Sequence, residues 1–281
     1  MNDTATDTPG IRESTPKSAA ADDAHELVAK LGTLAATPKL LVALDFDGTL
    51  APEVDDPQRA RALPEARAAL LALVALPNTR VALISGRAME SLEHVADVPD
   101  DVLLVGSHGV EFRLDSPDVT LNLDTTELEQ VEVLSEVLED VAAGLDQVWV
   151  ESKPAGFALH TRLATEKDSR IAHLQALNET RAEIDGLTVR EGKNVIEFSV
   201  RSATKGEALL QLKEYTKATA VLYAGDDVTD EDAFAVLGER DFGLKSGAGT
   251  TIAEFRVADP REVAGVLALL AELRGGAAPA H

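Results

Sequence analysis

Two aspartates that follow a short apolar run are the residues best suited to chemistry in this sequence. Asp45 and Asp47 come directly after Leu40–Leu44, a run typical of a strand buried on both faces of a parallel sheet. Positions i and i+2 share one side of an extended chain, so both carboxylates can face one cavity. Gly48 permits the turn that leaves the strand. Since ligands of open α/β sheets bind at the carboxyl ends of the strands, the pair predicts a functional site rather than an acidic turn.

A second acidic cluster follows another apolar run far along the chain. Asp226 and Asp227 follow Val221–Ala224 after a single glycine, and Asp230 follows three residues later. Capping of the next helix would explain one or two of these acids. It would not explain two adjacent carboxylates at a strand end, which repel each other unless a positive charge lies between them. Neither acidic cluster has the spacing of an EF-hand loop, and carboxylates with water suit Mg²⁺, so we expect a magnesium site.

Two further features lie where the expected sheet would present them to a phosphate group. Ser85, Gly86 and Arg87 follow an apolar run and offer a hydroxyl and backbone N–H groups beside a helix start, which suits a phosphate. Lys205 opens an expected helix, at the end where a cation is electrostatically unfavourable, so it could be directed at an anion. Taken alone, each feature also fits an ordinary turn or a solvated lysine.

The composition excludes several other kinds of site. Among 281 residues, 49 are Asp or Glu and 26 are Lys or Arg, which gives a net charge of −23. Such a chain repels nucleic-acid backbones and anionic lipids. The absence of cysteine excludes disulfides, thiolate ligands and cysteine nucleophiles. No apolar run approaches the ~20 residues of a membrane span, and the first residues lack the pattern of a secretory signal. We therefore expect a cytoplasmic protein that binds neither nucleic acid nor membranes.

Two stretches of the chain alternate short apolar runs with helix-like segments. The alternation predicts an α/β fold with a doubly wound parallel sheet. The expected strands are Leu40–Leu44, Val81–Ile84, Val102–Val105 and Ala220–Ala224, with short strands near Phe242 and Phe255. The expected helices begin at Pro64, Ala88, Lys205, Asp232 and Glu262.

The segment between these two stretches predicts a different unit. After a strand-like alternation at Val119–Leu123, it contains a helix at Glu127–Val141, a hairpin over 148–163, a helix at about Glu166–Ile184, and strands at 187–190 and 195–200 joined by a turn at Glu191-Gly192. The order predicts a small α+β module (α-β-β-α-β-β) at residues 115–200, inserted into a core formed by residues 23–114 and 201–281. Residues 1–22 are polar and small, so we expect a disordered tail.

The order of the motifs resembles that of the haloacid-dehalogenase-type phosphatases, whose four signatures are Asp45-Phe46-Asp47-Gly48-Thr49, Ser85-Gly86-Arg87, Lys205 and Gly225-Asp226-Asp227 in this chain. The likeness is closer to the trehalose-6-phosphate phosphatases and extends from about Lys39 to Leu273. It rests on the motifs 225–231, 159–162 and 192–197. The resemblance implies a Rossmann-like core with an inserted cap, which is the module at 115–200. Ser107 departs from the family pattern, because several relatives carry a larger residue there.

The resemblance implies a Mg²⁺-dependent phosphatase that hydrolyses trehalose 6-phosphate through an aspartyl-phosphate. It implies that Asp45 is the nucleophile and that Asp47 moves protons for the leaving sugar and the attacking water, with Ser85 and Lys205 binding the phosphoryl group. The implied metal ligands are Asp45, the Asp47 backbone carbonyl and Asp226, with Asp227 and Asp230 bound directly or through water. The implied substrate contacts are Gly86, Arg87, His108, Glu111, Lys153, Arg162, Lys193, Asn194 and Glu197.

Three alternatives stay open at this point. The same chemistry could serve another sugar phosphate, such as sucrose phosphate. A phospho-accepting signalling receiver also gathers Asp, Lys and an acidic pair around Mg²⁺, but its acidic pair precedes the phosphorylated Asp. A non-hydrolytic sugar-phosphate sensor would keep the fold, although the intact acids and Lys205 argue against lost chemistry. We expect a small-molecule substrate and infer no obligate protein partner.

Overall fold

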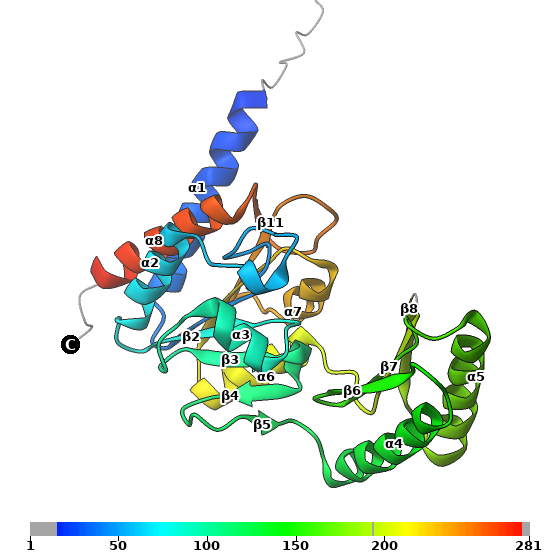
Figure 1. The fold of residues 1–281 in the computed structure, drawn as a ribbon. Helices are drawn as coiled ribbons and strands as arrows, with labels where there is room; N and C mark the ends of the chain where they lie inside the picture. Colours follow the sequence, from blue (N-terminus) through cyan, green and yellow to red (C-terminus); the bar gives the residue numbers. More distant parts are fainter. Residues whose placement is uncertain (1–15, 193, 277–281) are drawn as a thin grey trace, which may run out of the picture.

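Two sheets, each with its own hydrophobic core, organise the residues that the computed structural model describes, 16–192 and 194–276 (Figure 1). The larger lobe, here called the core, contains an eight-stranded sheet. The smaller lobe, the cap, contains a four-stranded sheet. The chain enters the cap after residue 121 and returns to the core before Lys205, so the cap is an insertion between two parts of the core.

The core sheet has the strand order β12-β11-β10-β1-β2-β3-β4-β5. Its strands are β1 (Leu40–Leu44), β2 (Thr79–Ile84), β3 (Leu103–Gly106), β4 (Glu111–Arg113), β5 (Thr120–Leu121), β10 (Ala220–Gly225), β11 (Phe242–Ser246) and β12 (Phe255–Val257). The strands from β12 to β3 are parallel, as predicted, whereas β4 and β5 are antiparallel additions at one edge. Sequence analysis missed β4, and β5 extends the core sheet although it comes from the segment assigned to the start of the cap.

Helices cover both faces of the core sheet, which confirms the doubly wound fold. Their bounds are α1 (Pro16–Ala35), α2 (Pro64–Val74), α3 (Met89–Ala96), α6 (Lys205–Thr216), α7 (Glu231–Ala235) and α8 (Pro260–Gly276). The buried residues Leu40, Val42 and Leu44 of β1 pack with α1, α2, α3 and α8. Leu41 and Ala43 of the same strand pack with α6 and α7. The apolar run of β1 is continuous because its alternate residues point to opposite faces of the sheet, and helices bury both faces.

The expected disordered tail is wrong for residues 16–22, because these residues form the start of α1. Alanine is the best helix former and Pro16 suits a first helical position, so this polar segment can continue a helix. Leu31 and Leu34, which are fully buried, anchor the other end of α1 in the core. Sequence analysis treated low hydrophobicity as disorder and did not weigh helix propensity. Residues 1–15 of the expected tail lie outside the described residues.

The cap has the predicted order of helix, hairpin, helix and hairpin. Its elements are α4 (Thr125–Ala143), β6 (Trp149–Lys153), β7 (Gly156–His160), α5 (Glu166–Glu183), β8 (Thr188–Gly192) and β9 (Val195–Ser199), with the antiparallel sheet order β6-β7-β9-β8. The predicted turn at Glu191-Gly192 is wrong, because both residues belong to β8 and Gly192 pairs with Val195. β8 ends at Gly192 and β9 begins at Val195, so the connection lies later along the chain than predicted. Asn194 has a φ of 61°, the conformation that two-residue hairpin turns favour.

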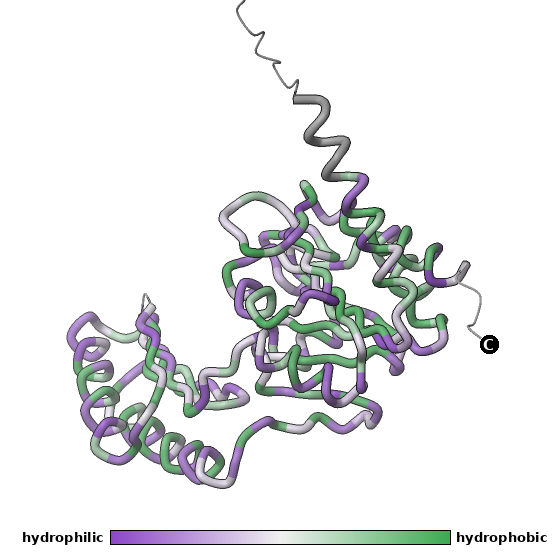
Figure 2. Tube along the Cα trace, turned by 180° about the vertical axis from the view of Figure 1, so that it is seen from behind, coloured by the Kyte–Doolittle hydropathy of each residue, from purple (hydrophilic) through white to green (hydrophobic). Residues whose placement is uncertain are grey.

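The two faces of the cap sheet differ in character. One face packs Phe157, Leu159, Ile196 and Phe198 against α4 and α5. The opposite face carries small or charged residues at the alternating positions, among them Gly156, Ala158 and Glu197. Figure 2 shows that apolar stretches gather in the core sheet, while the cap helices alternate between polar and apolar residues. Across residues 16–192 and 194–276, no helix is both long enough and apolar enough to cross a membrane.

Gly156 is required by the close approach of β7 and β9. A Cβ atom on Gly156 would lie 1.9 Å from the carbonyl oxygen of Phe198. We expect Gly156→Ala to lower the free energy of unfolding by about 1–3 kcal/mol, because the backbones must separate to admit the methyl group. Urea denaturation followed by circular dichroism measures the change.

Gly265→Ala in α8 is the matched control. No atom lies within 4 Å of the added Cβ, and Gly265 is exposed within a helix. The substitution should therefore raise the free energy of unfolding by up to about 1 kcal/mol. A Gly156→Ala protein at least as stable as the wild type would contradict the assigned strand approach.

Candidate active site

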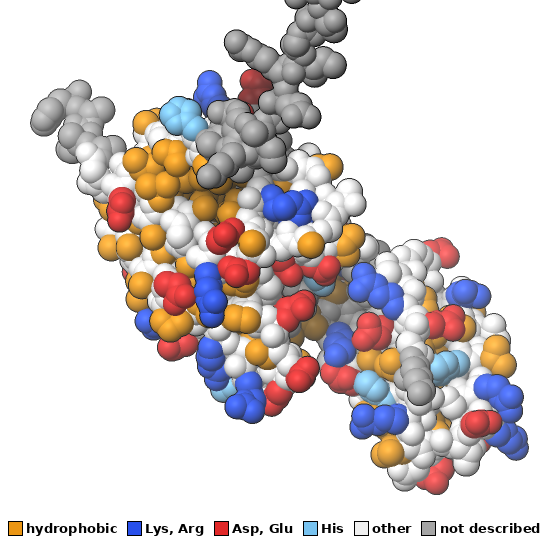
Figure 3. Space-filling view, turned by 90° about the horizontal axis from the view of Figure 1, so that it is seen from above, with side chains coloured by type: hydrophobic (Ala, Val, Ile, Leu, Met, Phe, Trp, Pro, Cys, Tyr) orange, Lys and Arg blue, Asp and Glu red, His pale blue; other side chains and the backbone are white. Residues whose placement is uncertain are grey.

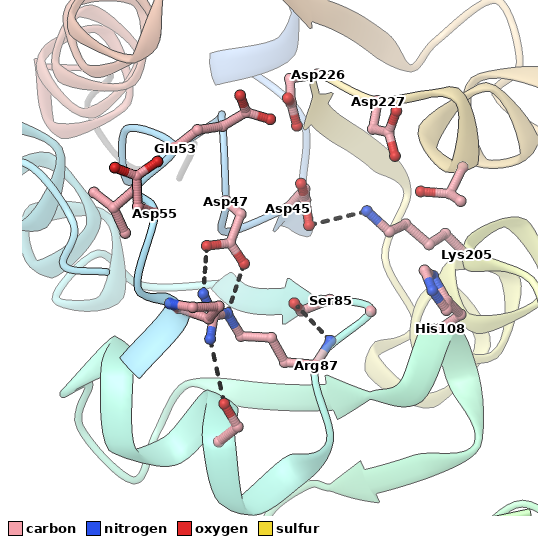
Figure 4. A pocket seen from close by; sticks show the side chains of 15 residues that line it. Asp45, Asp47, Glu53, Asp55, Ser85, Arg87, His108, Lys205, Asp226 and Asp227 are labelled. Carbon is pink, nitrogen blue, oxygen red and sulfur yellow. Dashed lines mark hydrogen bonds and ion pairs between the residues drawn. The ribbon is translucent and has the colours of Figure 1, made fainter. Parts of the chain in front are cut away.

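Acidic residues from distant parts of the sequence meet at the carboxyl edge of the core sheet (Figure 4). Asp45 follows β1 and Asp226 follows β10, and these strands are parallel neighbours in the sheet. Both side chains line a cavity of about 800 Å³, here called the core cavity. The other sequence-predicted residues that line it are Asp47, Ser85, Gly86, Arg87, His108, Lys205 and Asp227. The structure thus brings the four motifs to one place.

A buried lysine between two carboxylates forms the centre of the site. The Lys205 Nζ atom lies 2.9 Å from Asp45 Oδ1 and 2.8 Å from Asp230 Oδ1, and all three residues are at most 5% exposed. Burial would lower the pKa of Lys205, but the two carboxylates outweigh it and raise that pKa. Burial, with the charge of Asp230, raises the pKa of Asp45 well above its usual value although Lys205 opposes the change. One cation therefore does not fully compensate the buried acids.

Asp230 holds the acidic loop and Lys205 in place. Its Oδ1 atom accepts hydrogen bonds from Lys205 and from the hydroxyl of Tyr223 at 2.6 Å. Its Oδ2 atom accepts from the backbone N–H groups of Asp226 and Asp227, both at 2.9 Å. Because four donors already occupy this carboxylate, the arrangement favours an indirect role for Asp230 at a metal over direct ligation.

The geometry between β1 and β10 fits a hard cation with oxygen ligands. One carboxylate oxygen from each of Asp45, Asp226 and Asp230 lies within 4.8 Å of the others. The Asp226 carboxylate packs against Gly48, where a Cβ atom would lie 2.0 Å from Asp226 Oδ2. Burial and the charges of Asp230 and Asp227 raise the pKa of Asp226, although its contact with Asp45 and the charge of Lys205 lower it. A divalent cation between Asp45 and Asp226 would relieve this repulsion.

Asp47 is paired with Arg87 rather than with the other acids. The guanidinium of Arg87 contacts both oxygens of Asp47, at 2.6 and 2.7 Å, and donates to the Ser91 hydroxyl at 3.3 Å. The Asp47 side chain is 37% exposed, compared with 7% for Asp45. Arg87 therefore fixes the direction of the Asp47 carboxylate. Each oxygen of this carboxylate accepts one hydrogen bond from Arg87 and keeps a second lone pair free.

A strained turn presents His108 to the cavity. Ser107, His108 and Gly109 have φ values of 50°, 57° and 122°, an unfavourable run for the two residues that have side chains. Glu111 holds this turn, because its Oε2 atom accepts from the Ser107 hydroxyl at 2.7 Å and from the Met89 N–H at 2.9 Å. Glu111 is thus buried behind the turn and is not among the residues that line the two cavities described here. The hydroxyl of Ser107, where the chain departs from the family pattern, is used in this contact.

A second cavity of about 270 Å³, here called the inter-lobe cavity, lies between the core and the cap. Gly86 and His108 line both cavities, so the two spaces adjoin at these residues. From the cap, Lys153 and Glu197, two of the implied substrate contacts, line it. Figure 3 shows the hollow between the lobes, with basic side chains along its cap side.

Among the described residues, three sequence-predicted contacts line neither cavity, namely Glu111, Arg162 and Asn194. Arg162 follows β7 and is exposed, and Asn194 lies in the β8–β9 turn, where its carbonyl accepts from the Thr161 N–H. Lys193 lies outside the described residues. A sugar-binding role for these residues stays a prediction.

Sequence reasoning missed several residues that shape the site. Lys245 on β11 is only 3% exposed, and its ammonium group donates to the backbone carbonyl of Asp226 and lies 3.5 Å from that of Asp227. A lysine inside the apolar strand Phe242–Ser246 was the available signal. The other residues that were missed are Glu53 and Asp55 in the core cavity, and Arg190, Ser199 and Arg201 in the inter-lobe cavity.

Comparison with known proteins gives a consistent result. Residues 43–265 match the family model described as trehalose-phosphatase. The chain is 34% identical over 241 residues to a trehalose-phosphate phosphatase of Mycobacterium ulcerans, and 34% identical over 238 residues to a bifunctional trehalose-6-phosphate synthase/phosphatase of Thermoproteus tenax. These alignments cover 81% and 83% of this chain but only 60% and 32% of the relatives.

The structural comparison agrees with the sequence comparison. A trehalose-6-phosphate phosphatase of Aspergillus fumigatus superposes with a TM-score of 0.64 and 27% sequence identity. The superposition covers 87% of this chain and 97% of that structure, so both the core and the cap contribute to it. The fold is therefore that of the haloacid-dehalogenase-like phosphatases with a cap.

The environment of His108 predicts a pH-dependent stability. Burial lowers the pKa of His108, and the positive charges of Lys205 and Arg190 lower it further, while Asp230 and Asp227 oppose them. As the pH falls below the usual histidine pKa, the unfolded chain takes up a proton that the folded chain refuses, so the folded state loses stability. We expect His108→Asn, which tolerates the positive φ, to lose less stability than the wild type between pH 7.5 and 5.5.

Thermal melting of the two proteins at both pH values measures this difference. His94→Asn is the control, because His94 is exposed on α3, and it should follow the wild type. Equal pH dependence in the wild type and His108→Asn would show that the His108 environment does not disfavour the charged ring.

Proposed function

This chain belongs to the trehalose-phosphatase family, and from that premise we propose that it hydrolyses trehalose 6-phosphate to trehalose and phosphate. The observation that carries the proposal is the buried Asp45–Lys205–Asp230 cluster beside Asp226, at the end of a cavity that continues to the cap. The site combines a carboxylate nucleophile with positive charge for a phosphoryl group. A second space offers room for the sugar.

Asp45 is the nucleophile of the proposed reaction. One of its carboxylate oxygens attacks phosphorus, which forms an aspartyl-phosphate and breaks the bond from phosphorus to the sugar oxygen. Asp47 gives a proton to the departing oxygen and later takes one from the water that attacks the aspartyl-phosphate. That second attack releases phosphate and restores the Asp45 carboxylate. Arg87 holds the Asp47 carboxylate in position and leaves one lone pair of each oxygen free for these proton transfers.

Positive charge at the site stabilises the phosphoryl group. Lys205 and the hydroxyl of Ser85 line the core cavity on the side of Asp45, where they can contact phosphoryl oxygens. Mg²⁺ is the cation we propose for the space between Asp45 and Asp226, with the Asp47 backbone carbonyl as a further ligand. When bound, the ion offsets the charge of the phosphoryl oxygens.

The cap completes the site in this proposal. With phosphate in the core cavity, the sugar extends past His108 into the inter-lobe cavity, where Lys153 and Glu197 can reach its hydroxyls. Closure of the cap over the substrate would exclude bulk water from the reacting phosphorus. The substrate is a small molecule, and a cytoplasmic location stays a prediction from the sequence.

A panel of phosphate esters tests the activity and its metal dependence. We expect the highest kcat/KM for trehalose 6-phosphate, compared with sucrose 6-phosphate and glucose 6-phosphate, and loss of phosphate release in EDTA that excess Mg²⁺ restores. Phosphate release is measured for each ester under both conditions. Activity that persists in EDTA would exclude the metal role. Binding of trehalose 6-phosphate without phosphate release would indicate the sensor alternative.

Asp45→Asn tests the nucleophile. The amide cannot form the aspartyl-phosphate, so kcat should fall by more than about a thousandfold. Lys205 keeps its contact with Asp230 in this variant, so the fold should persist. Asp101→Asn, an exposed acid before β3, is the control and should keep wild-type kcat. Near wild-type turnover by a folded Asp45→Asn protein would refute the assignment.

A further inference from the structure

A charged pair on the cap wall of the inter-lobe cavity involves a residue that sequence analysis did not identify. Arg190 on β8 is directly opposite Glu197 on β9 in the antiparallel register. Directly opposite residues project from the same face of a sheet, with Cβ atoms about 5 Å apart. Both residues line the inter-lobe cavity, so this face looks toward the core.

Arg190 differs from the other cations of this wall in having no carboxylate partner among the described residues. The Lys153 ammonium lies 2.5 Å from Glu151, and the Arg201 guanidinium lies 3.1 Å from Glu127. Arg190 and Glu197 are both exposed, and within residues 16–192 and 194–276 neither forms an ion pair at 4.0 Å or less. Their polar groups are therefore available to a ligand in the cavity.

The position of Arg190 relative to the core supports a role in substrate binding. Its charge acts on the ring of His108, which belongs to the core and borders both cavities. Arg190 thus lines the cavity that would hold the sugar, which adjoins the phosphate-binding cavity at His108. This position, on the wall of a cavity, distinguishes Arg190 from arginines that contact only solvent.

The chemistry of the pair favours a sugar over a phosphate group. A guanidinium only donates hydrogen bonds and an ionised carboxylate only accepts them. Neighbouring sugar hydroxyls can do both, so one hydroxyl can accept from Arg190 while the next donates to Glu197. A phosphate would be attracted by Arg190 but repelled by the adjacent Glu197.

We propose that Arg190 is a specificity-determining residue that binds a sugar hydroxyl of the substrate together with Glu197. The inference rests on the proposed function, because it assumes a sugar phosphate whose phosphoryl group lies at Asp45. It adds a sugar contact that the motifs of the sequence did not indicate.

The experiment compares two substrates of one enzyme, trehalose 6-phosphate and p-nitrophenyl phosphate, which has no hydroxyl group. Arg190→Ala should lower kcat/KM for trehalose 6-phosphate by about 10- to 100-fold, as expected for a lost hydrogen bond to a charged group, and that for p-nitrophenyl phosphate by less than about twofold. Arg190→Lys, which keeps the charge, should give an intermediate loss. Arg170→Ala, an exposed arginine on α5 outside the cavity, should match the wild type on both substrates.

A double-mutant cycle with Glu197→Ala tests whether the two residues act together. If they bind neighbouring hydroxyls, the double variant should lose less on trehalose 6-phosphate than the product of the two single losses. Fully multiplicative losses would overturn the shared role. An equal loss on both substrates in Arg190→Ala, or no loss on either, would overturn the assignment of Arg190 itself.

Failure of the proposed function has a different signature. If the wild type prefers another sugar phosphate, trehalose 6-phosphate is the wrong substrate, and the same variants test Arg190 on the preferred one. If the wild type hydrolyses p-nitrophenyl phosphate but none of the sugar phosphates, both proposals are overturned.

Discussion

The contact on which the rest of the site depends is the buried ammonium group of Lys205 between Asp45 and Asp230. Removing ions from water costs several kcal/mol per ion, and only close opposite charges and full hydrogen bonding offset that cost. Two carboxylates around one ammonium leave an excess of negative charge. Burial, with the charge of Asp230 added to it, raises the pKa of Asp45 although Lys205 opposes the change. The fold therefore maintains an excess of negative charge at the end of β1, which a bound cation can neutralise.

Hydrogen bonds from neighbouring residues hold the acidic loop after β10 in place despite this repulsion. Asp230 binds the backbone of Asp226 and Asp227 from one side, while Lys245 binds the carbonyl side of the same loop. The loop after β10 is thus held through its backbone, which leaves the Asp226 side chain free to face Asp45. Groups that are fixed before a ligand arrives need not reorganise when charge develops, and this is the main advantage of a protein site over water.

The parts of the site that lie at the ends of parallel strands could be predicted from the sequence. The carboxyl ends of β1, β2 and β10 meet at one edge in any such sheet, so the motifs after each strand predicted a shared cavity. Contacts set by side-chain direction or register were not predictable in the same way. Arg87, an implied substrate contact, also forms an ion pair with Asp47 that no motif indicated. The strand predicted at 187–190 extends to Gly192, and the register that places Arg190 opposite Glu197 was not predicted. Lys245 was missed because its partners are backbone carbonyls, which no sequence pattern marks.

In the proposed function, the core cavity carries the reaction and the inter-lobe cavity selects the substrate. Residues around the core cavity are held by buried charges and backbone hydrogen bonds, which suits a reaction that is the same for every phosphate ester. The cap wall instead presents exposed charged side chains on a sheet face whose central positions, such as Gly156 and Ala158, are small. Gly86 and the strained turn at His108 join the two spaces, and Glu111 stabilises that turn from behind. Because Asp230 and Lys245 hold the acidic loop from within the core, the cap wall to which we assign sugar binding can vary without disturbing that loop.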